Sequence, residues 1–277
     1  MGITVGLDIG GSTTKIVGMK GAELIYKAII KADDPVTSAF GALGKLINDN
    51  NLSIKDIDRI NMTGVGSAFS DQNMLGIPTF EIKEFIATGL GGLYVSKFSE
   101  AVVVSMGTGT AYLYANENTV KHIIGSGVGG GTIVGLGNSM IGCSDALKLS
   151  EVATHGEINK VDLTIGDISN AEIPGLPMST TASNFGKAAE DLEKEDKIAG
   201  IFNLVYQSIG TMSVLSSRNV GVKDIVFTGQ LSVLKECEAT MKGFSELYEV
   251  NMVIPENSEY ATAIGACLSG DKEISLS

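Results

Sequence analysis

One stretch decides the fold: Val5-Gly6-Leu7-Asp8-Ile9-Gly10-Gly11-Ser12-Thr13-Thr14-Lys15. A short apolar run ends at a carboxylate, passes through glycines and hydroxyl side chains, and resumes as a second apolar run. Apolar runs of this length on both sides of a tight turn predict two antiparallel strands. The glycines leave backbone N–H groups bare, which suits a phosphate group. Asp8, at the end of the first strand, can hold a hydrated Mg²⁺.

A simple turn without a ligand is the alternative interpretation of this stretch. The stretch is not a Walker loop, which requires GxxxxGK[ST] followed by a helix. It is also not a dinucleotide-binding fingerprint, because no G-x-G-x-x-G opens a helix here.

A second copy of the pattern favours the phosphate interpretation. Residues 9–13 align with residues 106–110, at an offset of 97, with a strand before and after each. Such internal repetition predicts a duplicated domain with one glycine-hydroxyl hairpin in each half. Two hairpins facing each other across a cleft would hold a polyphosphate from both sides. Ser105 stands where the first copy has Asp8, so only the first half carries the metal-facing carboxylate.

Other segments add candidate sites and elements. The glycine run Gly125–Thr132 opens a helix and is either an anion site or a place of close helix–strand packing. Asp34 and Pro35 predict a helix start, with Val36, Phe40, Leu43, Leu46 and Ile47 as its apolar stripe. We expect helices at about Ser183–Glu193 and Lys197–Arg218, and irregular structure over Glu157–Leu176.

The composition excludes several classes of protein. The formal net charge of −12 makes binding to nucleic acid or to an anionic membrane surface unexpected. No apolar run reaches the roughly 18 residues that span a bilayer, and no signal peptide is evident. The widely spaced Cys143, Cys237 and Cys267 fit reduced thiols in a cytoplasmic protein. They also argue against a zinc site or an iron–sulfur cluster.

Taken together, these pieces resemble the superfamily of ATPases that includes actin, hexokinase and the heat-shock chaperones. Within it, the chain resembles the type II pantothenate kinases over nearly its whole length. The segments that carry this resemblance are Asp8–Ser12, Glu84-Phe85, Gly107–Thr110, Gly129–Thr132, Gly135–Gly137, His155-Gly156, Val161–Leu163, Ala182–Gly186 and Ala263–Ala266. The resemblance implies an α/β fold of duplicated ribonuclease-H-like (actin-like ATPase) domains, with mixed sheets and an interdomain cleft.

The resemblance also implies roles for individual residues. Glu84 would be the base that takes the proton of the substrate hydroxyl, and its place at a strand-to-helix junction agrees with that role. A solvated glutamate at a helix start is the alternative. His122 would contact the acceptor and the transferred phosphoryl group. ATP and Mg²⁺ would be held by Asp8 (the metal carboxylate), Gly10, Gly11, Ser12, Thr13, Lys15, Gly107, Thr108, Gly109, Thr110, Gly129, Gly130, Gly131, Thr228, Gly229 and Gln230.

Two departures from the family pattern lie on the acceptor side. Family members carry an arginine at the position of His122, and a histidine lacks its bidentate fork. Ile86 stands where a carboxylate commonly follows the Glu-Phe pair. Lys15 either reaches the phosphates or is a plain strand residue.

The sequence therefore predicts ATP-dependent phosphorylation of the 4′-hydroxyl of pantothenate, the first step of coenzyme A biosynthesis. We expect an N-terminal domain over residues 1–99 and a C-terminal domain over residues 100–277, a small-molecule substrate and a homodimer. Two alternatives remain open. One is a kinase of the same fold acting on another hydroxylated small molecule. The other is a non-kinase ATP-binding switch or activator ATPase.

Overall fold

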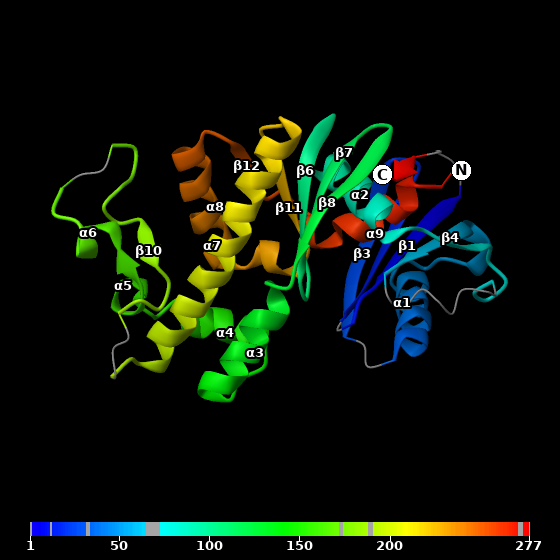
Figure 1. Ribbon diagram of the computed structural model, residues 1–277. Helices are drawn as coiled ribbons and strands as arrows, with labels where there is room; N and C mark the ends of the chain where they lie inside the picture. The colour runs from blue at the N-terminus through cyan, green and yellow to red at the C-terminus, as the bar shows by residue number, and fades with distance from the viewer. Residues whose placement is uncertain are drawn as a thin grey trace.

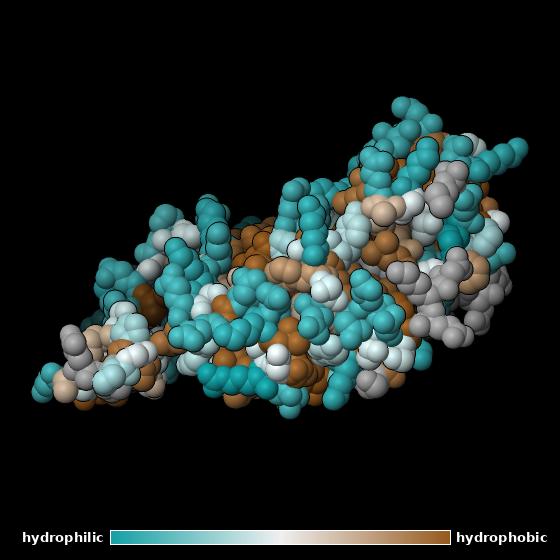
Figure 2. Space-filling view, turned by 90° about the horizontal axis from the view of Figure 1, so that it is seen from above, coloured by the Kyte–Doolittle hydropathy of each residue, from teal (hydrophilic) through white to brown (hydrophobic). Residues whose placement is uncertain are grey.

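A computed structural model describes residues 2–11, 13–31, 34–64, 73–171, 174–187, 191–270 and 274–276. Within them, two mixed sheets stand side by side with a pair of helices between them (Figure 1). Seen from above, the molecule is elongated, and mostly hydrophilic side chains cover the visible face (Figure 2).

The first sheet has five strands in the order β3-β2-β1-β4-β5. They are β1 (Ile3–Ile9), β2 (Thr13–Lys20), β3 (Glu23–Lys31), β4 (Ile57–Thr63) and β5 (Thr79–Glu81). β1 runs antiparallel to β2 and parallel to β4. The predicted hairpin is thus present, and its register sets Asp8 opposite Lys15.

Helix α1 (Pro35–Asp49) covers the outer face of this sheet. A short 3₁₀ helix, η1 (Ile54–Asp56), follows it and leads into β4. Asp34 caps α1 as predicted, accepting a hydrogen bond from the Thr37 N–H at 2.7 Å. The predicted apolar stripe is only partly right, because Val36 and Phe40 are exposed. The buried face instead uses small residues beside Leu43 and Leu46, which let the helix approach the sheet closely.

The second sheet repeats the topology of the first. It contains β6 (Glu100–Met106), β7 (Thr110–Asn116), β8 (Thr119–Ser126), β11 (Asp224–Thr228), β12 (Asn251–Val253) and β13 (Ser275–Leu276). Its order is β12-β11-β6-β7-β8-β13, so β8-β7-β6-β11-β12 matches the first sheet strand for strand and direction for direction. This confirms the duplicated fold.

The repetition extends to single backbone positions. Gly64 follows β4 with φ +94°, and Gly229 follows β11 with φ +90°. A Cβ atom added to Gly64 would lie 2.6 Å from the Ile9 carbonyl oxygen, and one added to Gly229 would lie 2.5 Å from that of Met106. Only glycine meets both demands, a left-handed backbone and direct contact with the neighbouring strand.

Helices α2 (Glu84–Ser96) and α9 (Ala261–Leu268) fill the space between the sheets (Figure 1). Each helix follows the last strand of its own repeat but packs on the sheet of the other. α2 contacts β6, β7 and β8, whereas α9 contacts β1, β2 and β4. The predicted boundary at residues 99/100 separates the strands of the two sheets, but packing exchanges these helices across it.

The remaining helices cover the outer face of the second sheet (Figure 1). They are α3 (Gly130–Ile141), α4 (Ala146–Ala153), α7 (Lys194–Val220) and α8 (Lys235–Tyr248), with short 3₁₀ turns η3 (Gln230–Val233) and η4 (Ser258–Tyr260). By length and composition α7 could cross a membrane, but 67% of its most apolar window is buried inside the protein. That burial is typical of a core helix, so α7 is weak evidence for a membrane span.

A small lobe projects beyond α7 (Figure 1). It contains α5 (Ile158–Val161), β9 (Leu163–Thr164), α6 (Ile165–Ile168) and β10 (Thr181–Ser183). The helix predicted from Ser183 is wrong in its described part, where a strand ends and turns follow. The buried Asp162 carboxylate accepts hydrogen bonds from the Phe185 N–H at 2.7 Å and the Asn184 amide at 3.0 Å. These bonds hold Phe185 at φ +53°, which a helix cannot contain.

Candidate active site

Three charged side chains interact near the end of β1 and the start of α2. The Lys15 ammonium lies 3.3 Å from an oxygen of Asp8, and both side chains are largely shielded from solvent. Glu84 opens α2 and interacts electrostatically with both of them. The predicted base and the predicted metal carboxylate therefore share one site. Lys15 is placed here as the ion-pair partner of Asp8.

The environment of Glu84 is unusual for a glutamate at a helix start. Its side chain keeps contact with solvent, yet surrounding protein atoms partly desolvate it. Desolvation is the main cause that raises the pKa of Glu84 above its ordinary value of 4.5, the negative charge of Asp8 raises it further, and Lys15 opposes both. A carboxylate with a raised pKa is a stronger proton acceptor than a freely solvated one.

The first glycine turn closes on itself at the edge of this site. The Gly10 N–H donates to the Thr13 carbonyl oxygen at 3.0 Å, and Gly11 is exposed. Ser12, predicted to contact a phosphate, lies outside the described residues. The turn thus directs its outer edge, at Gly11, to solvent, where a ligand could reach it.

The second glycine turn is supported from below by the glycine run. The Gly107 N–H donates to the Gly109 carbonyl at 2.9 Å, and Gly107 and Thr108 are exposed. The first N–H groups of α3 bind this turn, since Gly130 donates to Gly107 and Gly131 to Thr108, each at 2.9 Å. A Cβ at Gly129 would lie 2.7 Å from the Thr108 carbonyl oxygen.

Close packing therefore accounts for Gly129, Gly130 and Gly131 in this structure. The amides of Gly130 and Gly131 already donate to the hairpin, so they are not free donors for a phosphate group. These glycines shape the second turn from behind, which agrees with the close-packing alternative, and their contact with the nucleotide stays a prediction.

Thr228, Gly229 and Gln230 adjoin the same turn from the side of β11. Gly229 packs against Met106, directly before Gly107, and its N–H donates to the Ser258 carbonyl at 3.0 Å. The Oε1 atom of Gln230 is buried and has no hydrogen-bond partner. A buried amide oxygen without a partner is costly, and a bound ligand with an N–H donor would relieve that cost.

His122 on β8 lies against α2. Its imidazole ring stacks on the ring of Phe85, with centroids 4.7 Å apart and planes inclined by 4°. The predicted base and the predicted acceptor-side histidine thus belong to neighbouring positions, because Phe85 directly follows Glu84. Sequence reasoning quoted Phe85 only as part of the Glu84-Phe85 pair and missed its contact with His122, since no local pattern links residues so far apart along the chain.

The donor set fits magnesium only in its nucleotide-bound form. Among the described residues, no group of three or more His, Cys, Asp or Glu side chains could hold a metal ion. Mg²⁺ in phosphoryl-transfer sites commonly takes one or two carboxylates and completes its shell with phosphate oxygens and water. Asp8 supplies one such carboxylate, and Lys15 now balances its charge.

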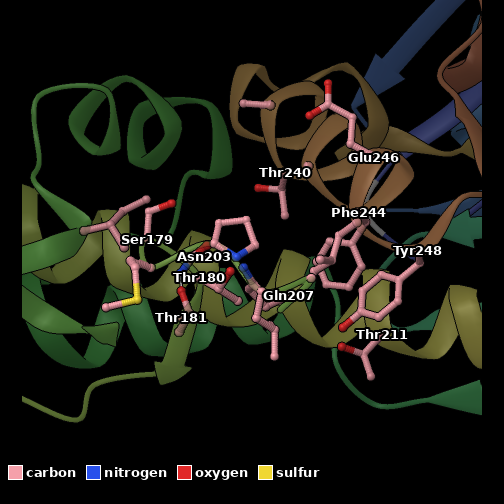
Figure 3. A pocket seen from close by; sticks show the side chains of 18 of the residues that line it. Ser179, Thr180, Thr181, Asn203, Gln207, Thr211, Thr240, Phe244, Glu246 and Tyr248 are labelled. Atoms are coloured by element: carbon pink, nitrogen blue, oxygen red, sulfur yellow. Dashed lines mark hydrogen bonds between the residues drawn. The ribbon is translucent and has the colours of Figure 1, made fainter. Parts of the chain in front are cut away.

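A large hollow lies elsewhere in the described part of the chain. It has a volume of about 1500 Å³ and separates the small lobe from α7 and α8. Thr180, Thr181, Asn203, Gln207 and Phe244 point into it (Figure 3). Its lining includes glutamates but neither lysine nor arginine, so it is a poor match for a triphosphate.

Two ribonuclease-H-like domains, each with a glycine hairpin after its first strand, place this fold in the class of actin-like ATPases and ROK-type kinases. The structure matches an activator of 2-hydroxyisocaproyl-CoA dehydratase from Clostridium difficile with bound ADPNP at a TM-score of 0.69 and 19% identity. The match covers 96% of this chain and 93% of that one. It also matches a ROK family glucokinase from Streptomyces griseus, in complex with glucose and AMPPNP, at a TM-score of 0.63 and 9% identity. This match covers 97% of this chain and 99% of that one. At such identities these matches show the fold alone.

Within that class, residues 96–269 match the Fumble family, and the chain belongs to it. It is similar to the type II pantothenate kinase of Staphylococcus aureus strain MRSA252, with 27% identity over 283 residues that cover 96% of this chain and 99% of the relative. The protein of the same name from Staphylococcus aureus strain USA300 is 27% identical over 279 residues, which cover 95% of this chain and 97% of that relative.

Proposed function

We propose that this protein is a pantothenate kinase that transfers the γ-phosphoryl group of ATP to the 4′-hydroxyl of pantothenate. The observation that carries the proposal is the electrostatic interaction of Glu84 with the Asp8–Lys15 ion pair, which lies next to the first glycine hairpin. Membership of the Fumble family and near-full-length similarity to type II pantothenate kinases support the same activity.

In this proposal the triphosphate lies between the turns at Gly10–Thr13 and Gly107–Thr110. Thr228, Gly229 and Gln230 contact the adenosine. Asp8 holds Mg²⁺ through water, and the ion neutralises charge on the phosphates when bound. With the nucleotide bound, Lys15 would be able to pair with a phosphate oxygen as well as with Asp8, because a lysine can satisfy either anion.

Glu84 orients the acceptor hydroxyl and takes its proton as the oxygen attacks the γ-phosphorus. Its raised pKa favours that transfer. His122 donates a hydrogen bond on the acceptor side. Closure of the two domains would exclude water and limit hydrolysis of ATP.

The test compares Glu84→Gln with Glu117→Gln, an exposed glutamate in the β7–β8 turn at the far end of that hairpin. Glu84→Gln should lower turnover by about 100-fold or more, as loss of a general base does, and leave ATP binding within a few-fold. Glu117→Gln should match the wild type. Wild-type turnover by Glu84→Gln would contradict the assignment of the base.

The acceptor itself is tested by ADP release across pantothenate, pantetheine, sugars and hydroxy acids. His122, in place of the arginine expected from the resemblance, favours a second candidate, a same-fold kinase for another hydroxylated molecule. Strong preference for a sugar would overturn pantothenate as the substrate. ATP turnover without any acceptor would instead indicate an activator ATPase, although the three cysteines lie unpaired on separate parts of the fold.

We further propose a cytoplasmic homodimer. The dimer rests on the resemblance to the family, because burial in its own domain already accounts for the apolar character of α7. Sedimentation of the purified protein tests it.

A further inference from the structure

Where the helix that carries Glu84 packs on the sheet of the second domain, the contact includes a stack of two rings. The rings of Phe85 and His122 are nearly parallel, at a centroid separation of 4.7 Å. That geometry is an offset stack, one of the favoured arrangements of planar rings. His122 is otherwise exposed, so Phe85 is the contact that fixes the plane of its imidazole.

A bulge in β8 brings His122 to this position. Tyr112 of β7 pairs with Ile124, but Leu113 pairs with His122, so Ile123 is an extra residue in the ladder. Side chains alternate between faces along a strand, and one extra residue reverses the alternation. Without it, His122 would lie opposite Tyr114, on the other face. With it, His122 shares the face of Leu113, which packs toward α2.

The free edge of the imidazole faces the second hairpin. A Cβ added to Gly125 would lie 3.8 Å from His122 Nε2 and 3.9 Å from the Thr110 carbonyl oxygen. Nε2 therefore lies beside the start of the glycine run and the end of the phosphate turn. Glu84, one residue before Phe85, interacts electrostatically with Asp8 and Lys15 of the first sheet.

We propose that Phe85 is a positioning residue for the acceptor: it holds the His122 imidazole so that one ring nitrogen meets an oxygen of the acceptor next to Glu84. This inference rests on the proposed kinase function. A fixed imidazole offers one directed hydrogen bond where a guanidinium would offer a bidentate fork. The acceptor group bound here is therefore recognised through a single oxygen atom, and the stack sets its direction.

The first experiment reads the stack directly, without any activity. The chain has two histidines, His122 and His155, so their ring protons can be followed separately by NMR and assigned with His122→Ala. The Phe85 ring current should move the His122 signals upfield of those of the exposed His155. Phe85→Leu should abolish that displacement, and Phe85→Tyr should retain it. Equal shifts for both histidines in the wild type would overturn the proposal.

The second experiment is a double-mutant cycle on the kinase reaction. Phe85→Leu should raise the KM for the acceptor by about 3- to 10-fold, the range expected for a lost ring stack, with the KM for ATP unchanged. Phe85→Tyr should restore the wild-type KM. In the His122→Ala background, Phe85→Leu should change the KM less than 2-fold, because its partner is already gone.

The matched control is Phe98→Leu, since Phe98 packs on the same apolar cluster as Phe85 but stacks on no ring of the described residues. An equal effect of Phe85→Leu with and without His122 would show that Phe85 acts independently, and would overturn the proposal. Failure of the proposed function gives a different result. In that case the wild type would not phosphorylate pantothenate. The NMR displacement, and the double-mutant cycle run with whichever acceptor causes ADP release, would still decide the role of Phe85.

Discussion

Replacing Gly91 with alanine should separate the two central helices. α2 and α9 cross with their backbones in contact, and a Cβ on Gly91 would lie 1.7 Å from the Ala261 carbonyl oxygen. The contact is reciprocal, because a Cβ on Gly265 would lie 1.7 Å from the carbonyl oxygen of Ala87. The same five-residue pattern, Ala-Thr-x-x-Gly, occupies both helices at the crossing.

The cost follows from the atoms involved. The helices must move apart by about 1.5 Å to restore ordinary van der Waals contact, and overpacking of this kind costs about 1–3 kcal/mol. The obstacle is a backbone carbonyl, which cannot rotate away, so we expect the upper end of that range. Alanine returns about 1 kcal/mol through its better helix propensity. The net loss of about 2 kcal/mol should lower the melting temperature by about 4–8 °C.

Calorimetry or circular dichroism measures this shift, with Gly44→Ala in α1 as the matched control. A Cβ at Gly44 has open space around it, so that variant should be neutral or slightly stabilised. Gly265→Ala should behave like Gly91→Ala. The double variant should lose less than the sum, because one separation of the helices accommodates both methyl groups. If Gly91→Ala melted like Gly44→Ala, the backbone contact at the crossing would be refuted.

Three further outcomes are expected. The kcat/KM should fall as the pH drops through the raised pKa of Glu84, because only the ionised carboxylate accepts a proton. Asp8→Asn should move that fall to lower pH, because it removes a charge that raises the pKa of Glu84. A pH profile that does not move would contradict the coupling between the two side chains. Asp162→Ala should lower the free energy of unfolding in urea by about 3 kcal/mol or more, because it leaves without a partner the N–H groups that donate to the buried carboxylate. Unchanged stability would show that other contacts anchor the small lobe. Gly129→Ala should weaken the binding of an ATP analogue, measured by calorimetry, about tenfold, because the added methyl group would displace Thr108. Gly127→Ala, which has open space for its methyl group, should bind the analogue like the wild type. Equal affinities of the two variants would contradict close packing under the turn.

The repeated glycine hairpin predicted the architecture because its signals are local. A strand, a turn and a second strand each leave a pattern within a few residues, and the offset of 97 linked the two copies. The order of both sheets follows from that duplication. The cap at Asp34 was equally legible, since its partner Thr37 is three residues away.

Errors arose where distant contacts override local preference. Residues from Ser183 onward favour a helix locally, but hydrogen bonds to the buried Asp162 hold the chain in a turn. α8 was not predicted, although Cys237, Met241 and Phe244 are buried at helical spacing and could have indicated it. The Phe85–His122 stack and the exchange of α2 and α9 left no pattern in the sequence, because both depend on how the two halves meet.

That exchange explains how one short chain assembles a site from both halves. Asp8 and Lys15 belong to the first sheet, and His122 belongs to the second. Glu84 and Phe85 lie on a helix that follows the first sheet and packs on the second, so Glu84 interacts electrostatically with the first group and Phe85 contacts His122. Because each sheet buries its inner face against a helix from the other repeat, neither repeat completes its own core. Glu84, the proposed base, is therefore held in place by the same packing that holds the two domains together.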